Sequence, residues 1–127
     1  MNIFDFLVIG SNGLLGSRIV KILKRKKSTL FTVARRNSNF NLNLNNFKKL
    51  DKLFKQNKFR IVINCAAIVD INYCEKKKNY SSIINTKFVK YLSKKSKKYN
   101  FKLVQISTDH VYKGDKKVPN KENNKTF

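Results

Sequence analysis

Three of the chain's four glycines, at positions 10, 13 and 16, recur at every third residue in the stretch VIGSNGLLGS. An apolar run precedes them and an amphipathic segment follows, which predicts a strand, a turn and a helix. In such a turn the first glycine permits the tight bend, the second lets backbone N–H groups reach a pyrophosphate, and the third lets the helix pack closely on the sheet. The helix N-terminus adds unpaired N–H donors and the positive end of its dipole. We therefore predict a pyrophosphate site formed by Gly10, Ser11, Asn12, Gly13, Leu14, Leu15 and Gly16. A glycine turn that binds no ligand is the alternative.

Two adjacent arginines, Arg35 and Arg36, close the next β-rich run, residues 30–34. At this point of a dinucleotide-binding fold an acidic side chain would bind the ribose 2′-hydroxyl of NAD, whereas arginine suits the 2′-phosphate of NADP. The pair therefore favours NADP, and NAD is the other option. In a chain this basic, the two arginines are also compatible with no role in binding.

Apolar periodicity predicts the elements that hold these residues in place. Short apolar runs predict buried strands, and apolar residues at three-and-four spacing predict helices. We expect strands at residues 3–9, 30–34, 59–67 and 101–107, and helices at residues 14–27, from Phe47 to Phe54, and along the stripe of Ile84, Phe88, Leu92 and Tyr99. A loop is expected before Ile84. Because strands that alternate with helices pair in parallel, the predicted class is α/β, a Rossmann-like, doubly wound parallel sheet of about four strands with three main helices.

The formal net charge of +22 is large for 127 residues. Lysine and asparagine dominate the polar composition, and the lysines fall where helix surfaces should face water. We therefore expect a solvated surface rather than a nucleic-acid partner, although a nucleic-acid binder is kept as an alternative. No apolar run is long enough to span a bilayer, so we expect a cytoplasmic protein. Cys65 and Cys74 match no ligand spacing, and His110 is the single histidine, so we expect free thiols and no metal site.

Four segments taken together resemble a known family. They are GSNGLLG, INCAAIVDINYCE, Asn85 and the strand end QISTDHVYKG. The combination resembles the extended short-chain dehydrogenase/reductase superfamily, and within it the dTDP-4-dehydrorhamnose reductase branch of sugar-nucleotide reductases, in which a strand ending in S-T-D-x-V-[FY]-x-G is typical. The resemblance runs from about Ile3 to about Glu122 and covers the N-terminal part of that family only.

The resemblance implies cofactor roles for particular residues. It places the pyrophosphate at residues 10–16 and the adenosine 2′-phosphate at Arg35 and Arg36. Asn43, followed by Leu44, stands where the family has an aspartate beside the adenine, and its side-chain oxygen could accept from the adenine amino group. The small residues Ala66 and Ala67, followed by Ile68, let the cofactor lie against the turn after the third strand.

The resemblance also implies catalytic roles. Thr108 corresponds to the hydroxyl residue that hydrogen-bonds the substrate carbonyl, and His110 replaces a more usual tyrosine nearby. Asn85 corresponds to an asparagine that supports the active-site water and lysine; a polar residue bonded to nearby backbone is the other interpretation. The family's catalytic Tyr-x-x-x-Lys pair would lie beyond Phe127. We expect none of the internal pairs with that spacing, Tyr73/Lys77, Tyr91/Lys95 and Tyr112/Lys116, to replace it.

The expected organisation follows from the resemblance. Residues 1–114 would form an incomplete NAD(P)-binding domain, and residues 115–127 a polar loop leading to a C-terminal half. The parent protein would transfer a hydride from NADPH to a 4-keto sugar nucleotide, and whether this chain alone is an enzyme stays open. A sugar-nucleotide epimerase or dehydratase, or a non-catalytic NADP-binding regulatory subunit, is the alternative. The sequence does not predict the oligomeric state.

Overall fold

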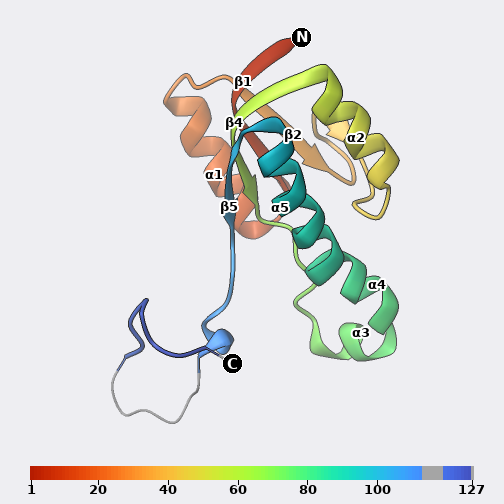
Figure 1. Ribbon diagram of the computed structural model, residues 1–127, viewed down its shortest axis with the longest axis vertical. Coiled ribbons are helices and arrows are strands. Elements are labelled where there is room, and N and C mark those ends of the chain that lie inside the picture. Colours follow the sequence, from red (N-terminus) through yellow and green to blue (C-terminus); the bar gives the residue numbers. More distant parts are fainter. Residues whose placement is uncertain (113–118, 127) are drawn as a thin grey trace.

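The computed structural model describes residues 1–112 and 119–126 (Figure 1). Within that part of the chain, one five-stranded parallel sheet has the order β3-β2-β1-β4-β5. The strands are β1 (Asn2–Ile9), β2 (Leu30–Ala34), β3 (Phe40–Asn41), β4 (Asn57–Asn64) and β5 (Lys102–Gln105). After β1, the chain adds β2 and β3 on one side of β1, and then β4 and β5 on its other side. The strand order therefore changes direction between β1 and β4.

Helices cover both faces of the sheet. They are α1 (Leu14–Arg25), α2 (Phe47–Gln56), α3 (Ile71–Lys76), α4 (Lys78–Ser82), the π-helix η1 (Ile83–Lys87), α5 (Phe88–Tyr99) and the 3-10 helix η2 (Asp109–Val111). Leu23 of α1 packs with Val8 on one face, whereas Phe54 of α2 and Phe88 of α5 belong to the larger core with Leu7 on the other. In the described ranges no helix is both long and apolar enough to cross a membrane.

Asparagine side chains and backbone determine where two of these helices begin or end. The Asn46 side chain accepts from the Lys49 N–H (3.1 Å) and caps the start of α2. At the C-terminal end of α5, Asn100 adopts the left-handed conformation (φ 54°), which asparagine tolerates better than most residues. Phe101 can then turn back into the core, and β5 begins at the next residue.

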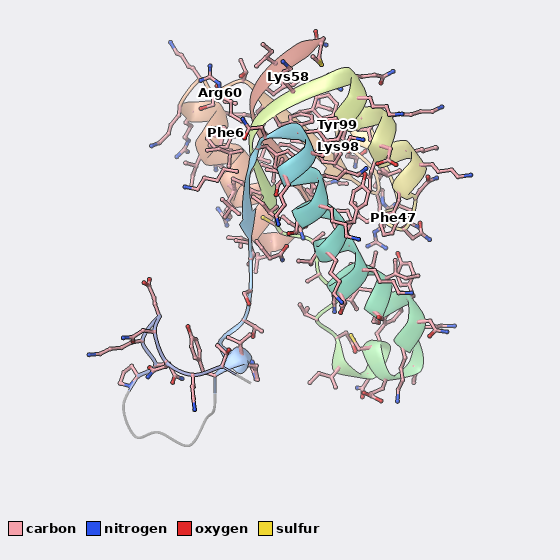
Figure 2. The ribbon with its side chains drawn as sticks, in the orientation of Figure 1. Phe6, Phe47, Lys58, Arg60, Lys98 and Tyr99 are labelled. Carbon is pink, nitrogen blue, oxygen red and sulfur yellow. The ribbon has the colours of Figure 1, made fainter. Side chains whose placement is uncertain are left out.

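Aromatic rings fill the space between α2, α5 and the sheet. The Phe54 ring stacks on Phe101 (centroids 5.3 Å apart) and on Tyr99 (5.8 Å), and meets Phe59 edge-on (5.9 Å). Figure 2 shows Tyr99 between the two helices and Phe47 at the start of α2, where Phe47 stacks on Tyr91 at 4.8 Å. Rings at these separations add to the stabilisation that their burial provides.

The predicted parallel α/β sheet is confirmed, with its three main helices α1, α2 and α5. Its fifth strand, β3, was not predicted because two residues carry no periodic signal. The third predicted strand is shifted, since β4 starts at Asn57 and ends at Asn64. The expected loop before Ile84 contains α3 and α4 instead. The predicted domain boundary at residues 114–115 lies outside the described residues and stays a prediction.

The buried ring of Phe54, which is 1% exposed, gives a direct measure of this core. We expect Phe54→Ala to lower the free energy of unfolding by about 3–5 kcal/mol, because truncation removes apolar contacts and leaves a cavity. Urea unfolding followed by far-UV circular dichroism measures the change. The control is Ile3→Ala, at a side chain that is 62% exposed. A loss for Phe54→Ala no larger than that of the control would contradict the assignment of this ring to the core.

Candidate functional site

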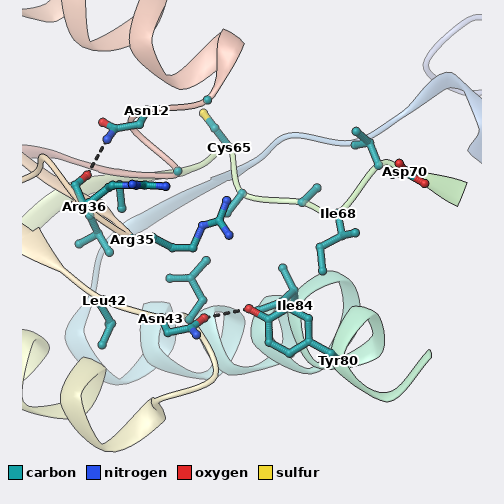
Figure 3. Close-up of a pocket in the computed structure, with 18 of the residues that line it drawn as sticks. Asn12, Arg35, Arg36, Leu42, Asn43, Cys65, Ile68, Asp70, Tyr80 and Ile84 are labelled. Atoms are coloured by element: carbon teal, nitrogen blue, oxygen red, sulfur yellow. Dashed lines mark hydrogen bonds between the residues drawn. The ribbon is translucent and has the colours of Figure 1, made fainter. Parts of the chain in front are cut away.

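A cavity of about 640 Å³ opens at the carboxyl ends of β1, β2 and β4 (Figure 3). This volume is in the range of small-molecule sites. Ligands of open α/β sheets bind at the carboxyl edge where the strand order reverses, which is where this cavity lies. Its lining residues are Gly10, Asn12, Gly13, Val33, Ala34, Arg35, Arg36, Asn37, Leu42, Asn43, Leu44, Cys65, Ala66, Ala67, Ile68, Val69, Asp70, Tyr73, Tyr80 and Ile84.

The glycine turn forms one end of the cavity. Gly10 has a positive φ of 77°, and a Cβ on it would lie 2.8 Å from the Ala66 nitrogen. A Cβ on Gly16 would lie 2.2 Å from the Gly10 oxygen, so both positions require glycine. Gly13 is the N-cap of α1 and provides no side-chain cap, and the first turn of α1 has no acidic residue. The first amides of α1 therefore keep the donors that an anion can use.

The two arginines follow β2 and line the wall next to the glycine turn. Figure 3 shows the Arg35 guanidinium extending toward the middle of the cavity. The Arg36 carbonyl accepts a hydrogen bond from Asn12 Nδ2 (2.5 Å), which joins this segment to the glycine turn. Neither guanidinium forms an ion pair with another described residue. The wall therefore presents uncompensated positive charge beside the turn.

The buried side chain of Asn64 holds the turn after β4 in place. Asn64 is fully buried; its Oδ1 accepts from the Ala66 N–H (3.1 Å) and its Nδ2 donates to Gln105 Oε1 (2.8 Å). Cys65, between Asn64 and Ala66 in the sequence, lines the cavity, and burial raises the pKa of its thiol. The two hydrogen bonds of Asn64 therefore hold Ala66 beside Gly10, where the two backbones lie so close that Gly10 has no room for a Cβ.

Asn85 holds the next part of the same segment. Its Oδ1 accepts from the Ile68 N–H and its Nδ2 donates to the Ile68 carbonyl, both at 2.9 Å. Asn85 itself does not line the cavity, but Ile68 does. Asn85 is therefore bonded to the backbone of the cavity wall, 17 residues away in the sequence, and the supporting role that the resemblance implies for it stays a prediction. Asn85 lies in the π-helix η1, a type of helical irregularity that is frequent at functional sites.

Asn43 and Tyr80 meet across the far end of the cavity. The Tyr80 hydroxyl donates to Asn43 Oδ1 at 2.8 Å and joins α4 to the segment after β3. Tyr80 was missed from the sequence because it falls where a loop was expected. Leu42 and Ile84 were missed because they lie outside the motifs, whereas Val69, Asp70 and Tyr73 belong to the segment INCAAIVDINYCE but were given no role in it.

The structure brings most of the predicted cofactor residues together. Ten of them line the cavity: Gly10, Asn12, Gly13, Arg35, Arg36, Asn43, Leu44, Ala66, Ala67 and Ile68. Four others, Ser11, Leu14, Leu15 and Gly16, belong to the turn and to α1 but do not line it. Binding by any of these residues stays a prediction. In the described ranges no group of three or more His, Cys, Asp or Glu side chains could hold a metal ion.

Thr108 lies apart from the cavity, on the segment that follows β5. Figure 1 shows this segment running away from the sheet on the opposite side from α3 and α4. Thr108 Oγ1 lies 3.1 Å from His110 Nδ1 and accepts from the His110 N–H at 3.3 Å. The structure therefore does not bring Thr108 and the glycine turn into one cavity, and the role predicted for its hydroxyl is untested.

The Tyr91/Lys95 pair connects α5 to α2. The Tyr91 hydroxyl donates to Asp51 Oδ1 (2.8 Å), and Lys95 Nζ lies 2.5 Å from the same oxygen. Burial and the hydrogen bond to Asp51 both raise the pKa of Tyr91. A tyrosine that transfers protons near neutral pH needs the opposite shift. Lys77 does not line the cavity beside Tyr73, and Lys116 lies outside the described residues.

The glycine turn, the parallel sheet and the cavity at the point where strand order reverses define a Rossmann-like domain of the dinucleotide-binding class. The family model described as RmlD substrate binding domain matches residues 4–127. The chain therefore belongs to this family, the RmlD substrate binding domain family.

The chain is also similar to individual proteins over nearly its whole length. The chain is 23% identical to a dTDP-4-dehydrorhamnose reductase of Streptomyces griseus over 95% of its own length and 38% of the relative. A crystal structure of a dTDP-4-dehydrorhamnose reductase from Clostridium acetobutylicum matches with a TM-score of 0.85 and 32% identity, over 97% of this chain and 42% of that one. The enzyme of the same name from Bacillus anthracis, solved in complex with NADP, matches with a TM-score of 0.78 and 25% identity, over 92% and 40%. The chain thus spans about two fifths of the length of the relatives it matches.

The close contact at Gly16 can be tested against Gly13. We expect Gly16→Ala to lower the free energy of unfolding by about 1–3 kcal/mol, because its Cβ would overlap the Gly10 carbonyl and force backbone to move. Gly13→Ala is the matched control, since the nearest heavy atom to its Cβ is 3.3 Å away. Urea unfolding measures both. Equal losses for the two variants would mean that the contact does not constrain the turn.

The Asp51 contacts predict a dependence of stability on pH. The hydrogen bond from Lys95, with another from Tyr91, lowers the pKa of the Asp51 carboxyl. The stabilisation is therefore complete above the unfolded-state pKa, about 3.9, and is lost as the pH falls through the lower folded-state value. We expect the free energy of unfolding to decrease on acidification less steeply in Asp51→Asn than in the wild type. Urea titrations at a series of acidic pH values measure the slopes, and parallel slopes would contradict this role.

Proposed function

We propose that this chain binds NADP and corresponds to the N-terminal, cofactor-binding part of a sugar-nucleotide reductase. The observation that carries the proposal is a single cavity with an uncapped glycine turn at one end and the Arg35 guanidinium in its middle. The turn offers backbone N–H donors to a pyrophosphate, and the guanidinium offers charge to a phosphate on the adjoining ribose.

NADP is preferred over NAD because the wall after β2 carries two arginines and no carboxylate. An acidic side chain at this position would bind the 2′-hydroxyl of NAD and repel a 2′-phosphate. The relative from Bacillus anthracis, crystallised with NADP, supports the same choice. NAD is the alternative that a comparison of the two cofactors tests.

In the whole protein we propose hydride transfer to a 4-keto sugar nucleotide, as the names of the dTDP-4-dehydrorhamnose reductase relatives suggest. Bound NADPH would supply the hydride. Residues of this chain would hold the pyrophosphate at the glycine turn and the 2′-phosphate at Arg35 and Arg36, while Thr108 would hydrogen-bond the substrate carbonyl. The described cavity contains no lysine beside Tyr73 or Tyr80, so it offers no tyrosine–lysine pair to protonate the product. We therefore propose that the chain alone binds the cofactor without turnover.

A second candidate is a non-catalytic NADP-binding subunit, since the glycine turn and the two arginines would bind the cofactor with or without catalysis. Both candidates require the same cofactor site. They differ in whether turnover appears once the remaining part of a reductase is joined to this chain.

The cofactor proposal is tested by titrating the chain with NADPH and following the fluorescence of the reduced nicotinamide. We expect saturable binding that is weaker for NADH. Arg35→Ala should raise the Kd of NADPH about tenfold, because a charge-assisted contact is lost, and should leave the Kd of NADH nearly unchanged. Arg25→Ala, at an exposed arginine near the end of α1, is the matched control.

Two results would overturn the proposal. A signal that does not saturate at millimolar NADPH would exclude cofactor binding by this chain. Reduction of a 4-keto sugar nucleotide by the isolated chain would overturn the absence of turnover.

A further inference from the structure

Asn12 is the only asparagine of the chain that a glycine follows. An asparagine in this position is prone to lose its side-chain amide, because the next backbone nitrogen can attack the side-chain carbonyl carbon and glycine has no Cβ to hinder the approach. Asn12 and Gly13 are both exposed, and they lie in the turn between β1 and α1. No helical or strand ladder therefore holds the two reacting groups apart.

The folded turn instead holds both nitrogens that take part in this reaction. The nucleophile is the Gly13 nitrogen, whose N–H donates to the Gly10 carbonyl at 3.0 Å. The leaving group is Asn12 Nδ2, which donates to the Arg36 carbonyl at 2.5 Å, as the dashed line in Figure 3 marks. The Gly13 nitrogen must lose its proton and the Asn12 side chain must turn toward it, so neither hydrogen bond can persist during the reaction.

We infer that Asn12 is a deamidation site whose rate is controlled by the opening of the glycine turn. In the open turn the Gly13 nitrogen forms a bond to Asn12 Cγ while the Cγ–Nδ2 bond breaks. Nδ2 leaves as ammonia, with the proton that the Gly13 nitrogen gives up, and a cyclic imide remains. Water then adds to one of the two imide carbonyls: opening on the Cγ side gives aspartate, and opening on the main-chain side gives isoaspartate. No group is oxidised or reduced.

Either product alters the wall that the glycine turn forms. A carboxylate at position 12 has no N–H to donate, so it meets the Arg36 carbonyl as a second acceptor. It also adds negative charge beside the first amides of α1. Isoaspartate lengthens the main chain where a Cβ on Gly16 would already lie 2.2 Å from the Gly10 oxygen. Deamidation therefore weakens cofactor binding; this consequence rests on the proposed NADP site, whereas the reaction does not.

The reaction is tested by incubating the chain without cofactor at mildly alkaline pH, either folded or unfolded in guanidinium chloride. Peptide mass spectrometry locates the aspartate and isoaspartate that form. In the unfolded chain we expect Asn12 to react faster than the other asparagines, and Gly13→Ala, the matched control, to react more slowly because its Cβ hinders the attack. In the folded chain the reaction of Asn12 should be about tenfold slower or more, since the turn must open first.

Two results would overturn the inference. In the first, Asn12 of the unfolded chain reacts no faster than the other asparagines. In the second, Asn12 reacts equally fast in the folded and the unfolded chain, which would mean that the two hydrogen bonds of the turn do not control the rate.

The consequence for binding is tested with Asn12→Asp, which imitates the aspartate product. We expect its Kd for NADPH to be about tenfold above the wild-type value, because a negative charge replaces an N–H donor at the turn. Asn72→Asp is the matched control and should keep the wild-type Kd, since it adds the same charge at an exposed residue of α3 that does not line the cavity. Far-UV circular dichroism checks that each variant is folded.

The outcomes separate the inference from the cofactor proposal. If Asn12→Asp binds NADPH as tightly as the wild type, the effect of deamidation on binding is wrong while the cofactor proposal stands. If the wild type gives no saturable signal with NADPH, the cofactor proposal fails, and the rates measured without cofactor still decide whether Asn12 is a deamidation site controlled by the turn.

Discussion

The site depends on how closely three backbone segments approach one another at Gly10. The Gly10 N–H donates to the Val33 carbonyl at the end of β2, and the Cys65 N–H donates to the Ile9 carbonyl, so the ends of β2 and β4 are both joined to the end of β1. The start of α1 then passes over the same residue, with no room for a Cβ at Gly16. Hydrogen bonds and steric contact therefore leave one arrangement for the strand ends, and the cavity is the space that remains beyond them.

Polar side chains extend this arrangement where the sheet ends. Beyond the last residues of β4 the backbone loses its ladder partners, and buried N–H and C=O groups must find others. Asn64 supplies a partner for Ala66, and Asn85 supplies both partners for Ile68. These two asparagines give the wall of the cavity a defined position before any ligand binds, which reduces the ordering that binding would require.

The sequence predicted these features unevenly, for physical reasons. The glycine turn, the sheet class and the three main helices follow from periodicity and from where glycine is indispensable, because those signals are local. The cofactor residues that the structure places in one cavity came from motifs, whereas Tyr80 lies in a short helix with no amphipathic period and meets Asn43 only in three dimensions. Asn85 was singled out by the resemblance, but its contact with Ile68, 17 residues away, was not predicted. Contacts between side chains far apart in the sequence are set by the tertiary fold, and a single sequence carries little sign of them.

The helical arm formed by α3 and α4 projects from the rest of the molecule in Figure 1. Helix α3 buries no side chain, and α4 buries only Ser81, whose hydroxyl has no hydrogen-bond partner in the described part of the chain. An element with so little buried surface opens locally at a small free-energy cost, well below that of global unfolding. One wall of the cavity thus has its own stability, separate from that of the sheet. Any ligand that contacts this arm spends part of its binding free energy on keeping it closed, and raises its resistance to local unfolding by the same amount.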